Sequence, residues 1–426
     1  MGLDAEDRRD VALLYAVHLA SYVLPLVTVT YVARVLGPAQ WGLLAFFHSF
    51  GLYTSQIIEY GFNLSATRDV ARLRGSVDAR AAALSEVNAA KVMLAAGFVA
   101  ALVPAFFLLP LFHENPLLFT MAAAYSLAQG FGMMWYFQGL GRIRELAGID
   151  VLSRAVASIL TCIAVRSQGD AWKMIALNTA ACLVTAAIGL ARSYRETPPR
   201  ALSFRGGIRM LRSGFPLFLF RGASTLFTSA NGFLLGLFAP PVTVGYYAGA
   251  ERAHRGLVAL LYPLTQVLYA RLSYSMGQQA LDKKRLGRSG FQAMLAAGLL
   301  LGAAAWILAP WIIRALLGPG FEPSVPALRI LAVALVADSI ATSLGMQWML
   351  PLGLDRQFTT VILAAGLTNL TLAPLLTARH GHLGMCFSVL ASEVVVALGC
   401  FAYLRSRQLD PFSPGPLPAQ ELKGTA

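Results

Sequence analysis

Charge is what this chain of 426 residues has least of: charged residues make up 13% of it, whereas a soluble domain carries about 25%. Hydrophobic residues make up 57%, and the mean hydropathy is +0.62. A chain with so few charges cannot cover a surface that faces water, which excludes an ordinary soluble protein. Long apolar runs stand in place of the missing charges, as in an integral membrane protein.

The chain also has few of the residues that carry catalysis. Its four cysteines (Cys162, Cys182, Cys386 and Cys400) lie in apolar runs without paired spacing, which argues against disulfides and metal sites. We find no nucleophile elbow, phosphate-binding loop, dinucleotide-binding fingerprint or metal-spaced His/Cys cluster. The connections on the expected outer side are too short to hold an active site. We therefore expect a protein that is not an enzyme and has no metal or bound cofactor.

We count twelve apolar runs, each long enough to cross a bilayer as a helix of about 20 residues. They cover residues 12–34, 41–60, 88–112, 116–138, 147–165, 171–191, 213–238, 243–270, 291–317, 325–350, 358–377 and 383–404. Arginine and lysine gather in alternate connections, at 68–80, 142–144, 192–212, 271–288, 356 and 405–407. The positive-inside rule places these connections and both termini in the cytoplasm. Topology and anionic lipids then account for the net charge of +13, and we expect no nucleic-acid partner.

The predicted fold is an all-α integral membrane protein with about 12 transmembrane helices in two six-helix lobes. We place the lobes at 1–191 and 213–408, joined by a basic cytoplasmic linker at 192–212 and followed by a disordered, proline-rich tail at 409–426. The second half opens like the first, with a proline-containing run, a short outer turn and a glycine-led run. Such internal symmetry is common in transporters, which bind substrate between the repeats.

Arginines interrupt several apolar runs, although a charge at the bilayer centre costs about 2.5–3.5 kcal/mol. Arg252 and Arg255 are three residues apart in the eighth run and share a helix face. Together with Arg221 in the seventh run and Arg154 in the fifth, they are candidate ligands for a diphosphate. Guanidinium binds phosphate oxygens through a planar fork and stays charged at any relevant pH.

Pairing within a helix is the alternative explanation for two of these arginines. Glu251 lies four residues before Arg255, and Asp150 lies four residues before Arg154. Residues at this spacing meet on the helix surface, so each pair could neutralise itself and only join helices.

Other ionisable residues in the apolar runs have more than one candidate role. Asp338 and Glu393 could take up H+ or Na+ as a coupling ion, or each could neutralise an arginine. Arg34 ends the first run and is a candidate outer gate or anchor. Lys91 lies near the cytoplasmic end of the third run, where its side chain is expected to reach the interface.

Five stretches of the chain resemble, in order, the Wzx-type polysaccharide repeat-unit flippases of the MOP exporter superfamily. The stretches are YVARVLGPAQWG at 31–42, YGFNLSATRD at 60–69, WYFQGL at 135–140, GYYAGAER at 245–252 and LGPGF at 317–321. The resemblance covers nearly the whole chain, and the preserved order makes it more specific than any single stretch.

The resemblance implies a MATE-like fold in the bacterial inner membrane and a flippase for an oligosaccharide linked to undecaprenyl diphosphate, moved from the cytoplasmic to the periplasmic leaflet. O-antigen, capsule and exopolysaccharide pathways share this transporter type, and a polysaccharide polymerase and a chain-length regulator are its implied partners beside membrane lipids. Two alternatives belong to the same superfamily. A multidrug or cation antiporter favours an acidic cavity, often with an aspartate in the first span, and a lipid II flippase typically has more spans.

Overall fold

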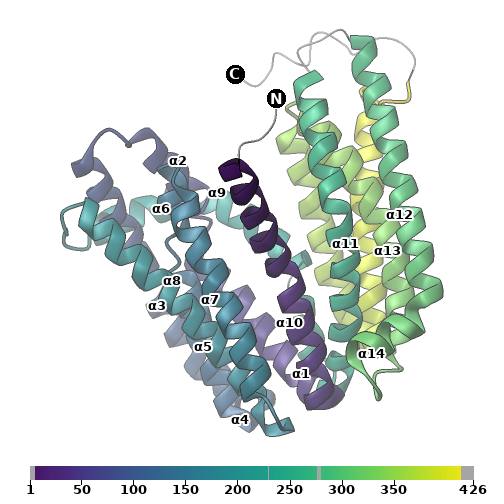
Figure 1. Ribbon diagram of the computed structural model, residues 1–426, viewed down its shortest axis with the longest axis horizontal. Helices are drawn as coiled ribbons and strands as arrows, with labels where there is room; N and C mark the ends of the chain where they lie inside the picture. The colour runs from purple at the N-terminus through teal and green to yellow at the C-terminus, as the bar shows by residue number, and fades with distance from the viewer. Residues whose placement is uncertain (1–4, 229, 276–279, 414–426) are drawn as a thin grey trace. The chain divides into compact units, whose positions relative to one another are not determined.

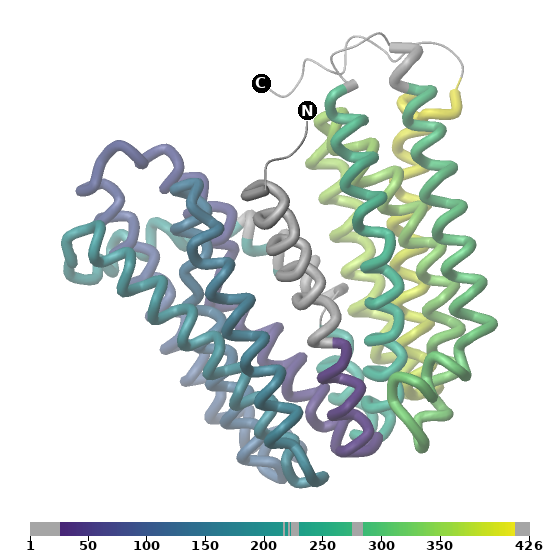
Figure 2. The backbone as a smooth tube through the Cα atoms, viewed as in Figure 1, coloured from purple at the N-terminus to yellow at the C-terminus, as the bar shows by residue number. Residues whose placement is uncertain are grey.

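The computed structural model describes residues 5–228, 230–275 and 280–413, without the side chains of 5–25, of much of 216–228 and of 280–283. Every regular element in this part of the chain is a helix (Figure 1). The helices form two compact units, an N-terminal unit of Met1–Thr225 and a C-terminal unit of Leu226–Ala426. Figure 2 follows the chain through each of them. A long apolar run in a bilayer has no water to bind its backbone polar groups, so it must form a helix.

The N-terminal unit contains the first ten elements. They are α1 (Ala5–Glu59), α2 (Ser65–Arg72), α3 (Val77–Leu108), α4 (Pro110–Glu114), α5 (Pro116–Gly130), α6 (Met134–Gly139), α7 (Ile143–Ala164), the 3-10 turn η1 (Gln168–Asp170), α8 (Ala171–Glu196) and α9 (Phe204–Thr228), whose last residues pass into the second unit. Helix α1 is broken at Gly37, where φ is 69°. Glycine adopts this left-handed conformation without steric cost, and Pro38 then starts the second segment. Helix α5 packs against α1 and α8, and α7 packs against α8.

The C-terminal unit contains the remaining six. They are α10 (Asn231–Gly236), α11 (Pro241–Ser275), α12 (Ala280–Leu317), α13 (Ser324–Leu344), the π-helical turn η2 (Gly345–Met349) and α14 (Asp355–Ser406). Helix α14 is broken at Gly381, where φ is 55°. Helix α13 packs against α11, α12 and α14, so it forms the centre of this unit (Figure 1).

All twelve expected runs coincide with helical segments once the breaks at Gly37 and Gly381 are counted. Seven helices in the described part of the chain are long and apolar enough to cross a membrane. The exact number of spans and the cytoplasmic position of the termini stay predictions. Residues 192–212 include the end of α8 and the start of α9. Along the chain, the boundary between the two compact units falls between residues 225 and 226, after that basic stretch.

The expected disorder from residue 409 onward is wrong for its first five residues. Trp348 Nε1 donates a hydrogen bond to the carbonyl of Leu409 at 2.9 Å, and Lys284 Nζ donates to Ser413 Oγ at 3.0 Å. Leu409 and Asp410 are buried. These contacts attach the segment to the helix ends of the C-terminal unit, and residues 414–426 lie outside the described residues.

Four of the five stretches that carried the family resemblance pack against each other in two pairs. In the N-terminal unit, Thr67 Oγ1 donates to the carbonyl of Trp135 at 3.1 Å, and a Cβ added at Gly139 would meet Val70 at 2.8 Å. In the C-terminal unit, Gly249 lies so close to Leu317 that an added Cβ would overlap it. At these contacts, residues of the recognisable stretches hold helix ends together.

Candidate functional site

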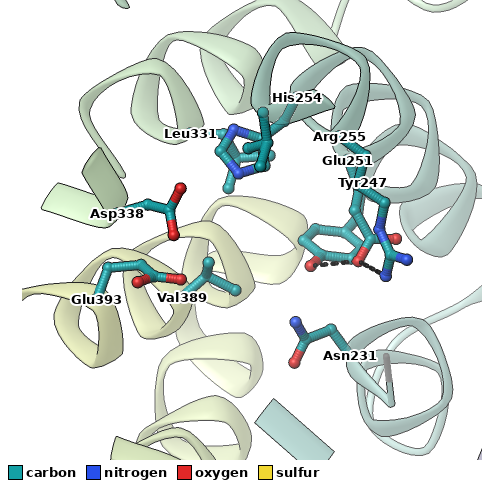
Figure 3. Close-up of a pocket in the computed structure, with 10 residues that line it drawn as sticks. Asn231, Tyr247, Glu251, His254, Arg255, Leu331, Asp338, Val389 and Glu393 are labelled. Atoms are coloured by element: carbon teal, nitrogen blue, oxygen red, sulfur yellow. Dashed lines mark hydrogen bonds and ion pairs between the residues drawn. The ribbon is translucent and has the colours of Figure 1, made fainter. Parts of the chain in front are cut away.

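A pocket of about 250 Å³ lies inside the C-terminal unit, between α10, α11, α13 and α14 (Figure 3). Its polar lining residues are Asn231, Tyr247, Glu251, His254, Arg255, Asp338 and Glu393. Among these described residues, three carboxyl groups face a single guanidinium group. This pocket is therefore acidic on balance, and the cationic cavity predicted from the arginines in the apolar runs stays a prediction.

Glu251 is the centre of a small network on α11. Arg255 Nη2 donates to Glu251 Oε1 at 3.0 Å, and the Tyr247 hydroxyl donates to the same oxygen at 3.3 Å (Figure 3). The pairing of Glu251 with Arg255, one of the two readings that the spacing allowed, is thus confirmed. The Arg255 side chain nevertheless keeps 43% of its surface exposed. Glu251 therefore orients an arginine side chain that is still partly exposed.

Asp338 on α13 and Glu393 on α14 lie on the opposite side of the same pocket, with their carboxyl groups turned toward it (Figure 3). The two side chains lie next to each other on this side of the pocket (Figure 3). Among the described residues neither forms an ion pair within 4.0 Å. Two neighbouring carboxylates without a counter-charge are unfavourable in a low-dielectric interior. The structure places these two residues on one pocket, which the sequence did not predict.

A chain of amide and hydroxyl groups continues from the pocket into the unit. Asn369 Nδ2 donates to Asn231 Oδ1 at 2.8 Å, and Ser388 Oγ donates to Asn369 Oδ1 at 2.7 Å. On the other side of the pocket, His254 Nδ1 is buried without a hydrogen-bond partner among the described residues. Groups of three or more His, Cys, Asp or Glu residues that could hold a metal ion are absent from this part of the chain.

Arg154 lies in a separate cluster within the N-terminal unit. Its Nε donates to Asp150 Oδ2 at 2.9 Å, and its Nη2 donates to Gln129 Oε1 at 3.1 Å. Cys182 on α8 donates to the same Gln129 oxygen at 3.1 Å. The expected pair of Asp150 with Arg154 is confirmed. The Arg154 side chain remains 40% exposed, so this arginine is held by α5 and α7 and still presents part of its guanidinium.

The other candidate residues have different outcomes. Arg252 is half-buried on α11 but does not line the pocket that Arg255 lines, so the structure does not bring these two arginines together on one cavity. Arg34 is exposed three residues before the break at Gly37, and its role as a gate stays a prediction. The side chain of Arg221 lies outside the described residues.

Lys91 does not reach the interface as expected. Its side chain is 0% exposed, and Nζ donates to the carbonyl of Gly132 at 2.9 Å and lies 6.0 Å from the centre of the Trp135 ring. Gly132 follows the end of α5, where backbone carbonyls have no partner within the helix. A cation at a helix C-terminus is favourable, so Lys91 is a structural cap and the snorkelling interpretation is wrong.

Gln129 and Tyr247 are the site residues that sequence reasoning missed. Gln129 is a polar residue in an apolar run, and Tyr247 is four residues before Glu251. The polar residue in an apolar run and the spacing of four residues were both visible in the sequence. Neither of them identifies the residue that the side chain contacts. The partner of Gln129 is on another helix, and its identity depends on how α5 and α7 pack.

Comparison with known proteins shows which family this chain matches. Residues 8–276 match the family described as polysaccharide biosynthesis protein. The chain is 28% identical over 410 residues to a candidate O-antigen transporter of Escherichia coli (strain K12), covering 94% of this chain and 97% of that protein. It is 25% identical to a candidate O-antigen transporter of Shigella dysenteriae, covering 92% and 98%.

Two solved structures share the fold. An inward-facing multidrug resistance transporter of the MATE family and MOP superfamily matches with a TM-score of 0.69 and 15% identity, over 92% of this chain and 96% of that one. The lipid II flippase MurJ in an inward closed conformation matches with a TM-score of 0.70 and 13% identity, over 92% and 87%. At these identities the likeness shows the fold alone.

Proposed function

Because the chain belongs to the family of polysaccharide biosynthesis proteins, we propose that it is a multi-pass flippase for lipid-linked oligosaccharides. Its substrate is an oligosaccharide repeat unit on undecaprenyl diphosphate, moved from the cytoplasmic to the periplasmic leaflet of the bacterial inner membrane by alternating access. The observation that carries this proposal is the similarity to the candidate O-antigen transporter over 94% of the chain. A polysaccharide polymerase and a chain-length regulator are the partners that would receive the product.

The diphosphate is proposed to bind to guanidinium groups. Arg255 and Arg154 support this because each is oriented by a carboxylate and still has about two fifths of its side chain exposed, 43% and 40%. An oriented guanidinium binds phosphate oxygens with less loss of side-chain freedom than a mobile one. Arg252 on α11 and Arg221 on α9 are further candidates for the same role.

A coupling cation, H+ or Na+, is proposed to bind between Asp338 and Glu393. With Glu251 and Arg255 cancelling each other, these two carboxylates leave the pocket negatively charged, which would repel a diphosphate. A bound cation removes that repulsion, so cation and diphosphate would bind together. The coupling is reciprocal by thermodynamic necessity: the substrate raises the affinity for the cation by the same factor.

The test uses purified protein reconstituted in liposomes with a lipid-diphosphate oligosaccharide. A membrane-impermeant glycan-modifying reagent is added outside, and protein-dependent protection of the sugar is followed with and without a H+ or Na+ gradient. Protection that depends on the gradient and is lost in Arg255→Ala supports both the function and the site. Protection that stays equal in wild-type and protein-free liposomes, across several glycans, would refute the flippase proposal.

A cation antiporter is the second candidate, and the acidic lining of the pocket is the observation that favours it. Efflux of ethidium from the same liposomes separates the two. The flippase proposal expects no gradient-driven ethidium transport, whereas an antiporter would show ethidium transport and no protection of the glycan.

A further inference from the structure

A second, larger pocket of about 410 Å³ lies in the N-terminal unit, away from the Arg154 cluster. Its walls are α3 and α8, and the irregular backbone between α5 and α6 forms its floor. The lining is almost entirely apolar and includes Val92 on α3, Met133 on the floor, and Leu183 and Ala187 on α8. Helix α8 packs mainly on α5 and α7, so the space beside α3 is left as a groove.

The open side of this groove is apolar as well. Val92 is 37% and Leu183 is 54% exposed, and both belong to helices that are long and apolar enough to cross a membrane. At the depth of such helices the surrounding medium is hydrocarbon, so a hydrocarbon chain and not water is the species that fills an apolar groove.

One end of the groove leads to a basic cluster. Arg142 contacts Glu145 at 2.5 Å and Glu196 at 2.7 Å, Arg80 contacts Glu196 at 3.9 Å, and Arg192 contacts Glu145 at 3.9 Å. Three guanidinium groups thus share two carboxylates, which leaves one positive charge in excess. The contact of Arg80 with Glu196 also joins α3 to α8.

The cluster and the groove are continuous. Tyr194, the last lining residue on α8, packs with Met133 and Tyr136 in one buried cluster. The Tyr136 hydroxyl accepts a hydrogen bond from Arg80 Nη1 at 3.5 Å. An apolar groove therefore ends at a site with surplus positive charge, which is the arrangement that a lipid with a phosphate head group and a hydrocarbon tail would fit.

We propose that the groove between α3 and α8 binds one acyl chain of an anionic glycerophospholipid, whose phosphate contacts the cluster of Arg80, Arg142 and Arg192. The positive charge at the end of the groove favours an anionic head group, and the apolar lining favours a hydrocarbon chain. This lipid site is distinct from both clusters assigned to transport and does not depend on the proposed function.

The experiment is native mass spectrometry of the purified full chain in detergent, with added dioleoyl phosphatidylglycerol, dioleoyl phosphatidylcholine or undecaprenyl phosphate. The wild type is expected to retain phosphatidylglycerol in preference to phosphatidylcholine. Ala187→Trp fills the groove and should lower retention about tenfold, and Arg192→Gln should lower it about fivefold.

Val184→Trp and Arg205→Gln are matched controls. Val184 is 47% exposed on α8 outside the groove, and Arg205 is an exposed arginine outside the cluster. Both should remain within about twofold of the wild type.

Unchanged retention of phosphatidylglycerol in Ala187→Trp would overturn the site. Equal loss in Ala187→Trp and Val184→Trp would overturn it too, because the loss would then not be specific to the groove. Displacement of phosphatidylglycerol by an equal amount of undecaprenyl phosphate would replace the proposed occupant with an isoprenoid lipid. Melting temperature in detergent checks folding, and Ala187→Leu takes the place of the tryptophan variant if that variant does not fold.

Discussion

The two units of this protein compensate their membrane-embedded charges in different ways. In the N-terminal unit two cations within the apolar runs have their partners close by: Arg154 has Asp150 and Gln129, and Lys91 has the carbonyl of Gly132. In the C-terminal unit Glu251 and Arg255 cancel, but Asp338 and Glu393 add two carboxyl groups without an ion pair among the described residues. Paired charges stabilise the fold, whereas two neighbouring carboxyl groups without an ion pair favour the binding of a proton or a metal cation. The comparison is the reason why we propose ion binding for the C-terminal unit.

The largest expected effect tests that assignment. The double substitution Asp338→Asn/Glu393→Gln removes both surplus carboxylates and mimics their neutral state. Transport driven by a H+ or Na+ gradient is expected to fall at least about a hundredfold, equivalent to roughly 2.7 kcal/mol, while substrate binding is retained. Glycan protection in liposomes measures the rate. Asp170→Asn in the N-terminal unit, whose carboxylate pairs with Lys173 outside both clusters, is the control, and an equal loss of gradient dependence in that variant would break the comparison.

Arg255 and Arg252 should differ although they lie three residues apart. Arg255→Ala removes the guanidinium that lines the pocket and leaves Glu251 unpaired, so transport is expected to fall about tenfold or more. Arg255→Lys should restore part of it, because charge is kept and the planar fork is lost. Arg252→Ala should have a smaller effect, since Arg252 does not line the pocket. Equal losses in the two alanine variants would contradict this distinction.

Besides its proposed role in binding, the pair of Arg154 with Asp150 should contribute to stability. Arg154→Ala leaves Asp150 without its partner, and the double variant Arg154→Ala/Asp150→Ala should recover part of the lost stability. We expect a coupling energy of about 1 kcal/mol or less, because the guanidinium is 40% exposed and solvent weakens the pair. Thermal unfolding in detergent for the wild type, both single variants and the double variant gives this value. Additive effects would mean that the pair contributes nothing.

The smallest effect on transport is expected from substitution of Lys91. Lys91→Met removes the hydrogen bond to Gly132 but also removes the cost of burying an ammonium group, so the two changes partly offset each other. The expected loss is about 1 kcal/mol, or a shift of roughly 2–4 °C in melting temperature. Lys173→Met, at a half-buried lysine paired with Asp170, is the comparison variant. A large loss of transport with unchanged melting temperature would show that Lys91 does more than cap a helix.

Several of the site contacts were predictable because they are local. A spacing of four residues on one helix predicts a meeting of side chains whatever the tertiary structure. This is why the pairs Asp150–Arg154 and Glu251–Arg255 were foreseen. A spacing of three predicts a common helix face for Arg252 and Arg255, but it does not decide which of them lines the pocket described here; Arg255 does, and Arg252 is not among the lining residues.

The sequence by itself determined that the chain is helical and where its helices run. Apolar runs of this length must satisfy their backbone hydrogen bonds internally, and the breaks at Gly37 and Gly381 follow from glycine's access to positive φ. Only the tertiary structure decided which helices bring their polar residues together. Asp338 and Glu393 share a pocket, and Lys91 reaches a carbonyl 41 residues away. Such contacts depend on how each helix is rotated and tilted against its neighbours, and the spacing of residues within one helix carries no information about that.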